Sequence, residues 1–256
     1  MSQSKIRDFC TFCLGIVLIG VLIQAAGALK GDRLVFPGVD EILRAFFRLM
    51  VTPKTYALIW TTLKHLIASM LVSTLIGITL GILQGMIPLV RNLLKPLMIL
   101  LRSLPMVILI VIVMVVTDYS RVPVIASSII LIPMIAEAAC EGCRRIDPEL
   151  IDVYRMNANF NPRVLFSVYL PLMAGYLRQA YVNAVGMGVK LAVSTVYLVQ
   201  TGNSLGKAVH TSGYFNEYQD IYAYALVMIL LVLAVSEGPV IIGRIVSARR
   251  AKARQH

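Results

Sequence analysis

Residues 57–86 read ALIWTTLKHLIASMLVSTLIGITLGILQGM, an apolar run in which Lys64 is the one charged side chain. A helix needs about 20 apolar residues to cross the hydrocarbon core of a bilayer, because each residue advances it by about 1.5 Å. The run is therefore long enough to span a membrane as a helix. It predicts that the chain is built from membrane-spanning α-helices.

The composition supports this interpretation for the whole chain. Of the 256 residues, 58% are hydrophobic and 14% are charged, and the mean hydropathy is +0.80. A soluble domain carries about 25% charged residues, so this chain lacks the polar surface of one. The alternating pattern of an outer-membrane barrel is missing from the sequence. The predicted class is an all-α integral membrane protein.

The net charge of +11 does not indicate a nucleic-acid partner. No basic patch interleaved with aromatic residues lies outside the apolar runs. Lys and Arg residues gather at the ends of the runs, where they set the orientation of membrane helices. We therefore expect no binding to nucleic acid.

Six spans fit the apolar runs, and together they form a single transmembrane domain over residues 1–256. The first run follows Lys5 and Arg7. At about 20 residues it exceeds the 7–15 apolar residues of a signal peptide, so we expect it to be retained as a helix. The six spans are expected at about 9–29, 57–86, 96–116, 122–141, 172–199 and 221–246.

The distribution of basic residues sets the expected orientation. With the N-terminus in the cytoplasm, most Lys and Arg residues outside the spans fall on the cytoplasmic side, as the positive-inside rule requires. Both termini are then cytoplasmic, and the protein is expected in the inner (cytoplasmic) membrane. The outer loop 30–56 departs from the rule with five basic residues. Within it, residues 39–50 have helical spacing and are predicted to lie along the outer interface.

The longest cytoplasmic loop, 142–171, is also the most polar segment of the chain. Asp147 can cap a helix and Pro148 suits its first turn. The helix that follows has an apolar face and a polar face. Such a helix can dock in a groove of a soluble partner. On amphipathicity alone, a short interfacial helix without a partner fits equally well.

The spacing within this loop resembles a known motif. Ala158 stands six residues after Asp152, and nine further residues lead to Val168-Tyr169-Leu170-Pro171. This resembles the motif of permease subunits in ATP-binding-cassette (ABC) importers: Glu-Ala-Ala, three residues, Gly, nine residues, Ile, one residue, Leu-Pro. The segment Glu137-Ala138-Ala139 has the wrong spacing to Gly142, and we interpret it as the end of the fourth span.

The resemblance extends over nearly the whole chain and favours the nitrate/sulfonate/taurine branch of the type I ABC importers. Further short matches agree with the family in order and spacing: His65-Leu66-Ile67-Ala68-Ser69, Lys95-Pro96-Leu97, Arg102-Ser103-Leu104-Pro105, Gly142-Cys143-Arg144-Arg145-Ile146-Asp147-Pro148 and Gly202-Asn203-Ser204-Leu205-Gly206. The chain departs from the family at Ala158 (usually Gly), Lys190 (usually Trp), Tyr197 (usually Glu) and Thr117-Asp118 (usually Phe-Gly). These departures leave the substrate open.

The resemblance implies the transmembrane-domain fold of type I ABC importers, with six helices and a cytoplasmic coupling helix. It implies import of a small solute, favouring an anion such as a sulfonate, nitrate or bicarbonate. The implied partners are two ATP-binding subunits, a second permease copy forming a homodimer, and an extracytoplasmic substrate-binding protein.

The resemblance also places ATP and Mg²⁺ in the partner subunit. This chain has no Gly-rich phosphate-binding loop with Gly-Lys-Ser or Gly-Lys-Thr. We therefore expect no enzyme activity and no cofactor in it. The residues implied in coupling to the ATPase are Glu149, Asp152, Val153, Tyr154, Arg155, Met156, Asn157, Ala158 and Asn159.

Charged residues inside the predicted spans are candidates for the substrate pathway. A charge at mid-membrane is costly and normally faces a cavity or a partner. Arg102 and Lys190 therefore either line a path for an anion or reach the interface by snorkelling. Other polar residues follow Lys190, and they either contact substrate or hold helices together. They are Ser194, Thr195, Tyr197 and Gln200.

Glycines recur every four residues in the second span, at Gly77, Gly81 and Gly85. A face lined with glycine lets two helices approach closely. We predict a packing face here, with a hinge for conformational change as the alternative. The lone His65 in the same span is interpreted as a helix-contact residue.

The pairs Cys10-x-x-Cys13 and Cys140-x-x-Cys143 raise the alternative of a zinc or iron–sulfur site. The first pair lies inside an apolar run, and buried cysteine commonly serves as a small apolar residue. We therefore expect no metal site. Glu137 and Glu141 are expected to solvate the end of the fourth span and to pair with Arg144 or Arg145.

Two alternatives to the anion importer stay open at this point. The same architecture also imports aromatic solutes such as thiamine precursors in related permeases. A secondary transporter or channel that acts without an ATPase is a different class. It would need ion-coupling acidic residues at mid-span, and Asp and Glu fall mainly outside the spans or at their ends.

Overall fold

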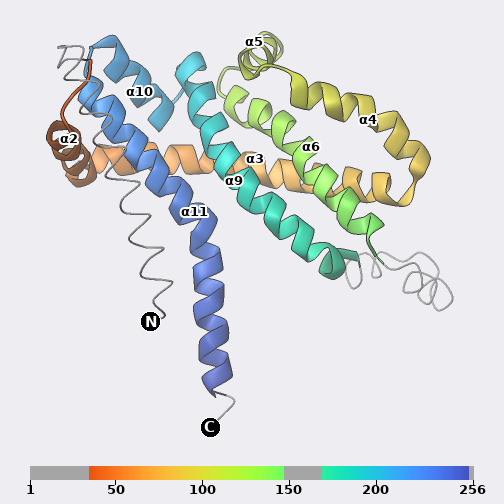
Figure 1. Ribbon diagram of the computed structural model, residues 1–256. Coiled ribbons are helices and arrows are strands. Elements are labelled where there is room, and N and C mark those ends of the chain that lie inside the picture. The colour runs from red at the N-terminus through yellow and green to blue at the C-terminus, as the bar shows by residue number, and fades with distance from the viewer. Residues whose placement is uncertain (1–34, 147–168, 254–256) are drawn as a thin grey trace.

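The structure is a computed structural model that describes residues 35–146 and 169–253, with side chains for 35–146 and 169–236. All its regular elements in these ranges are helices (Figure 1). They are α2 (Val39–Val51), α3 (Pro53–Met86), α4 (Pro88–Ser103), α5 (Met106–Val116), α6 (Val122–Arg144), α9 (Leu170–Val199), α10 (Leu205–Tyr214) and α11 (Tyr218–Ala253).

Among the described residues, four helices are long and apolar enough to cross a membrane, or five if the bent pair α4–α5 forms one span. The four are α3, α6, α9 and the segment Tyr218–Ser236 of α11. The first predicted span, 9–29, lies outside the described residues. The count of six spans therefore stays a prediction, while the all-helical membrane class agrees with the structure.

The third predicted span, 96–116, is not one straight helix. The chain breaks at Leu104-Pro105, and α4 and α5 meet at an angle of 103°. Proline lacks a backbone N–H and disfavours helical dihedrals in the residue before it, and Leu104 is accordingly extended, with φ −63° and ψ 127°. The sequence Arg-Ser-Leu-Pro thus ends one helix, and α4 starts earlier than expected, at Pro88.

The glycine face of α3 packs against α6, as predicted. A Cβ atom added at Gly77 would lie 2.9 Å from the Ile135 Cβ, and one at Gly85 would lie 2.6 Å from the Cys143 Cβ. Real Cβ atoms do not approach other atoms so closely. The small residues therefore allow the two backbones to approach each other, and α6 packs closely along α3.

Helix α9 lies against both α6 and α3, and α10 folds back onto α9 (Figure 1). Gly188 of α9 receives Leu66 of α3, where an added Cβ would lie 2.6 Å from the Leu66 Cδ1. Gly206 brings α10 against the Val193 carbonyl of α9. The Leu205 amide at the start of α10 donates to the Thr62 Oγ1 at 3.1 Å. These contacts place α10 at one end of the bundle.

The predicted helix at residues 39–50 forms as α2 and lies across the first turns of α11. Arg48 of α2 makes an ion pair with Asp220 of α11. The Asp220 side chain is only 13% exposed, so this pair is more buried than the pair Arg44–Asp40 on the outer side of α2. At the end of the molecule that carries α10, both apolar contacts and this ion pair therefore hold α2 against α11.

Candidate functional site

The predicted coupling residues Glu149, Asp152, Val153, Tyr154, Arg155, Met156, Asn157, Ala158 and Asn159 lie outside the described residues. The structure does show where their loop begins and ends. Ile146 and Tyr169 are both buried in one apolar cluster with Met173 and Leu177 of α9. The residues on either side of the loop are thus packed together.

Helix α9 carries a polar stripe that other described elements contact at its two ends and leave open in the middle. We define the α9 stripe by six residues at spacings of three, four or seven, which place them on one helical face: Tyr176, Gln179, Asn183, Lys190, Ser194 and Tyr197. Four of them are exposed, and Tyr176 and Ser194 are partly buried. The opposite face is buried through residues such as Leu177, Ala192 and Val196. A helix with this division presents its polar face to water or to another protein.

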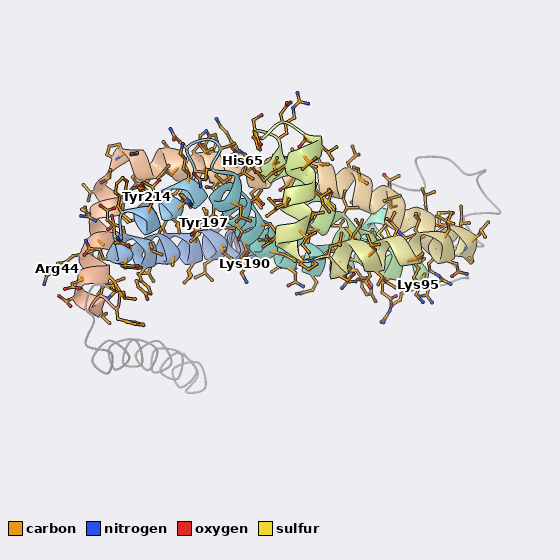
Figure 2. The ribbon with its side chains drawn as sticks, turned by 90° about the horizontal axis from the view of Figure 1, so that it is seen from above. Arg44, His65, Lys95, Lys190, Tyr197 and Tyr214 are labelled. Atoms are coloured by element: carbon orange, nitrogen blue, oxygen red, sulfur yellow. The ribbon has the colours of Figure 1, made fainter. Side chains whose placement is uncertain are left out.

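Lys190 lies near the middle of the α9 stripe. Figure 2 shows it between Lys95, toward one end of the molecule, and Tyr214 and Arg44, toward the other. Its ammonium group has no ion pair within the described residues. An uncompensated charge on a membrane-spanning helix marks a water-filled or protein-lined path.

At one end, the α9 stripe borders a groove of about 670 Å³ between α6 and α9. Glu137 and Glu141 of α6 line it opposite Gln179 and Asn183. Glu141 accepts a hydrogen bond from the Arg145 Nε at 2.8 Å, and it also pairs with Arg144 at 3.7 Å. The predicted pairing of Glu141 with these arginines is confirmed.

Arg145, the residue after α6, lies among groups that favour its charged form. The hydrogen bond to Glu141 raises the pKa of the Arg145 guanidinium, and the Tyr176 side chain acts in the same direction. The guanidinium also lies over the Tyr176 ring, 5.6 Å from its centroid. Arg145 therefore links the end of α6 to α9.

At the other end, the α9 stripe meets a cluster formed with α10. The rings of Tyr197 and His210 lie edge to face with centroids 5.2 Å apart, and the Gln200 Nε2 is 2.8 Å from the His210 Nε2. Gln200 ends α9 in the left-handed region, at φ 57°. Sequence reasoning identified Tyr197 and Gln200 but missed His210, because the turn that brings α10 back has no local signal at position 210.

Two predicted pathway residues lie elsewhere. Thr195 is 1% exposed on the packed face of α9, and its hydroxyl donates to the Leu191 carbonyl at 2.7 Å. Arg102 lies in the last turn of α4 and pairs with Glu137 of α6. Both partners of that pair are about half exposed, so water screens the attraction. The pairing of Glu137 with Arg102, rather than with Arg144 or Arg145, was not foreseen.

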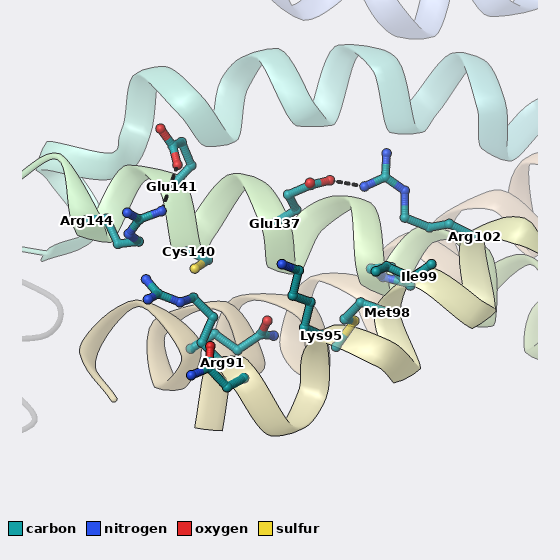
Figure 3. Close-up of a pocket in the computed structure, with 12 residues that line it drawn as sticks. Arg91, Lys95, Met98, Ile99, Arg102, Glu137, Cys140, Glu141 and Arg144 are labelled. Atoms are coloured by element: carbon teal, nitrogen blue, oxygen red, sulfur yellow. Dashed lines mark hydrogen bonds and ion pairs between the residues drawn. The ribbon is translucent and has the colours of Figure 1, made fainter. Parts of the chain in front are cut away.

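A second cavity, of about 600 Å³, lies between α4, α6 and the end of α3. Figure 3 shows Arg91 and Lys95 of α4 reaching toward α6, while Glu137 is joined to Arg102 and Glu141 to Arg144. We call this the α4–α6 cavity. Its charged and amide-bearing lining residues are Gln84, Arg91, Asn92, Lys95, Arg102, Glu137, Glu141 and Arg144.

The hypothesis of a four-cysteine metal site depends on Cys10 and Cys13, which lie outside the described residues. Cys140 and Cys143 are both free and buried in α6. Cys143 packs against Gly85, which is the behaviour of a small apolar residue. Among the described residues, no group of three or more His, Cys, Asp or Glu side chains converges.

The sequence matches one known protein family over most of its length. A search of curated proteins finds no significant match. The profile of one family, described as the inner membrane component of binding-protein-dependent transport systems, matches residues 73–252. The match starts within α3 and continues through most of α11, so it includes α6, α9 and the loop between them.

Members of this family are the permease components of ABC importers, which work with ATP-binding and substrate-binding components and whose ATPase lies in a separate subunit. The matched region covers well over half of the chain, and the helices that it contains are long and apolar enough for a multi-pass membrane protein. The chain belongs to the family of binding-protein-dependent transport system inner membrane components, the permeases of ABC importers.

Proposed function

We propose that this permease imports a small anion, of the sulfonate, nitrate or bicarbonate type, along the α9 stripe. The observation that carries the proposal is Lys190, which makes no ion pair within 35–146 and 169–236 and lies in the middle of an otherwise uncharged polar stripe. A cation at this depth favours an anion over a cation or a neutral solute. The neighbouring amides and hydroxyls supply hydrogen bonds that orient the solute.

The proposed assembly contains two copies of this chain, two ATP-binding subunits and an extracytoplasmic binding protein that delivers the solute. The polar stripe is too costly to leave against lipid, which favours a path between two permease copies. Both termini are proposed to be cytoplasmic. The coupling helix within 142–171 is proposed to dock on an ATP-binding subunit.

The proposed mechanism rests on the packed ends of that loop. When ATP binding draws the ATP-binding subunits together, the coupling helices move with them. Ile146 and Tyr169 share one apolar cluster, so the movement passes to α6 and α9 together. The helices then shift between two packed arrangements that open the path to opposite sides, and hydrolysis restores the first arrangement.

The test is uptake by the reconstituted importer with Lys190→Gln. Loss of one charge-assisted hydrogen bond is worth roughly tenfold or more in affinity, so anion uptake should fall by about that factor. The matched control is Arg178→Gln, which removes an exposed cation from the same helix but off the stripe. Anion uptake that is equal in both variants would contradict the proposed path, and uptake without ATP would indicate a secondary transporter.

An aromatic solute, such as a thiamine precursor, is the second candidate. The observation that favours it is the edge-to-face pair of rings at Tyr197 and His210, since aromatic side chains can stack on a flat aromatic molecule. Uptake of an aromatic solute that fails in Tyr197→Ala but survives in Lys190→Gln would favour this candidate over the anion.

A further inference from the structure

We propose that the α4–α6 cavity is a binding site for a phosphate-type oxyanion, held by Arg91, Lys95 and the side-chain amide of Gln84. The shared chemistry is a tetrahedral phosphate, from the head group of an anionic lipid or from free phosphate. The three proposed binding residues do not belong to the α9 stripe, although Glu137 and Glu141 line both this cavity and the groove beside the stripe. The proposal does not depend on the solute that the importer carries.

The two faces of α4 place the cations in the cavity. Arg91, Lys95 and Arg102 recur at spacings of four and seven and share one face. The opposite face carries exposed leucines, and no residue of α4 is buried. They are Leu89, Leu93, Leu97 and Leu100. An amphipathic helix of this kind lies in the membrane interface, with its cations toward the cavity and its leucines toward the acyl chains.

The ion pairs among the described residues leave two of the cavity's cations uncompensated. Arg102 is paired with Glu137, and Arg144 with Glu141. Arg91 and Lys95 have no ion pair within the described residues, although both line the cavity. They stand one turn apart on α4, so their like charges repel each other. An anion between them removes that repulsion.

Gln84 supplies an independent indication of a ligand. Gln84 is 6% exposed and lines the same cavity. Its Nε2 has no hydrogen-bond partner in the part of the chain that the structure describes. A buried amide without a partner is costly, and nearly all such groups in proteins are satisfied. An oxygen of a bound oxyanion would satisfy it.

The three groups match a phosphate better than a single carboxylate. Arg offers a fork of donors, Lys offers a point charge, and the amide adds a neutral donor from a second helix. A phosphate presents several acceptor oxygens in different directions, whereas a carboxylate presents two in one plane. A volume of about 600 Å³ also has room for the rest of a lipid head group.

The experiment measures the thermal midpoint of the purified full chain in two arms. In one arm, inorganic phosphate replaces chloride at constant ionic strength in detergent. In the other, the chain is placed in nanodiscs of phosphatidylcholine with or without phosphatidylglycerol. Bound ligand in hundredfold excess over its Kd should raise the midpoint by about 5 °C. A response in one arm only identifies the source of the phosphate.

The test variant is Arg91→Gln with Lys95→Gln, and the matched control is Arg44→Gln with Arg121→Gln. Both double variants lose two positive charges. Arg44 and Arg121, however, lie outside the cavity lining, and each pairs with an exposed aspartate. The test variant should bind about 100-fold more weakly, at roughly tenfold for each charged hydrogen bond. The control should keep the full response.

The substitution Gln84→Met should affect the stability of the ligand-free chain and its binding of ligand in opposite directions. Without ligand it removes an unsatisfied amide, so the thermal midpoint should stay the same or rise. With ligand, the response should be weaker than in the unsubstituted chain. The proposal is overturned if neither arm responds, if Arg91→Gln with Lys95→Gln keeps the response, if the control loses it equally, or if Gln84→Met binds as tightly as before.

Discussion

At Gly81 the lack of a side chain determines how closely two helices approach. An added Cβ would lie 2.5 Å from the Ala139 Cβ and still closer to the Ala136 carbonyl oxygen. The backbone of α6 cannot move out of the way cheaply, because it is packed along its whole length. Gly175 of α9 is also in a helix, yet an added Cβ there would meet nothing within 4 Å.

These two positions make a matched pair of Gly→Ala substitutions. Both gain helix propensity, about 1 kcal/mol, so their difference isolates the cost of overpacking, about 1–3 kcal/mol. We expect Gly81→Ala to lower the thermal midpoint relative to Gly175→Ala. Equal midpoints in the two variants would mean that α3 and α6 do not approach as the structure has them.

A second pair of residues tests the attachment of α2 to α11. Asp220→Asn should destabilise the protein by about 1–3 kcal/mol, because the carboxylate that accepts from Arg48 is largely buried. Asp40→Asn is the control, because Asp40 is also in the first turn of its helix and also pairs with an arginine, but on the exposed surface. It should cost about 0.5 kcal/mol or less.

The measurement is thermal unfolding of the two single variants, followed by a double-mutant cycle of Asp220→Asn with Arg48→Gln. A coupling free energy near zero in that cycle would show that the two residues do not interact.

At the scale of the helix, the break between α4 and α5 is the feature with the largest consequences. It brings Arg102 to Glu137 and places the basic face of α4 against α6. The proline that causes the break is visible in the sequence. The direction in which the chain leaves it is not, because a proline that ends a helix permits several extended conformations after the break.

Spin labels on either side of the break measure it directly. Leu89→Cys and Val115→Cys are both exposed positions, and a straight helix would separate them by about 39 Å at 1.5 Å per residue. Because of the bend, we expect a clearly shorter distance between the two labels. The distance is measured by pulsed electron paramagnetic resonance in a chain whose native cysteines have been replaced. Ala57→Cys with Leu83→Cys spans the same number of residues within the single helix α3 and should give about 39 Å.

At the scale of the whole molecule, the end of α6 and the start of α9 meet in one apolar cluster, in which Ile146 and Tyr169 are both buried. Reversing a charge in the predicted coupling helix, by Asp152→Lys or Arg155→Glu, should disturb its contact with the ATP-binding subunit. Loss of one strong interface contact costs about tenfold or more. Uptake and the stimulation of ATPase activity by solute should therefore fall together in the reconstituted importer.

The control for this prediction is Arg121→Glu, which reverses a charge at an exposed position in the loop between α5 and α6, far along the chain from the coupling helix. It should leave the ATPase stimulation unchanged. Intact uptake and intact stimulation in both coupling variants would remove residues 149–159 from the contact with the ATPase.

The sequence by itself determined the membrane class, the positions of the long helices, the glycine face and the polar residues that end α9. These properties depend on the transfer of neighbouring side chains between water and lipid and on helical periodicity, which are local. The sequence could also have predicted the rest of the α9 stripe, because Tyr176, Gln179 and Asn183 continue the helical spacing of Lys190 toward the start of α9.

Only the tertiary structure decided which charges meet. The pairs Arg102–Glu137 and Arg48–Asp220, the contact of His210 with Tyr197, and the α4–α6 cavity all join residues from different helices. Such contacts depend on the rotation and depth of each helix relative to its neighbours. Those quantities are set by the packing of all the helices together, through close approaches such as Gly81 on Ala139, and not by any one segment of the chain.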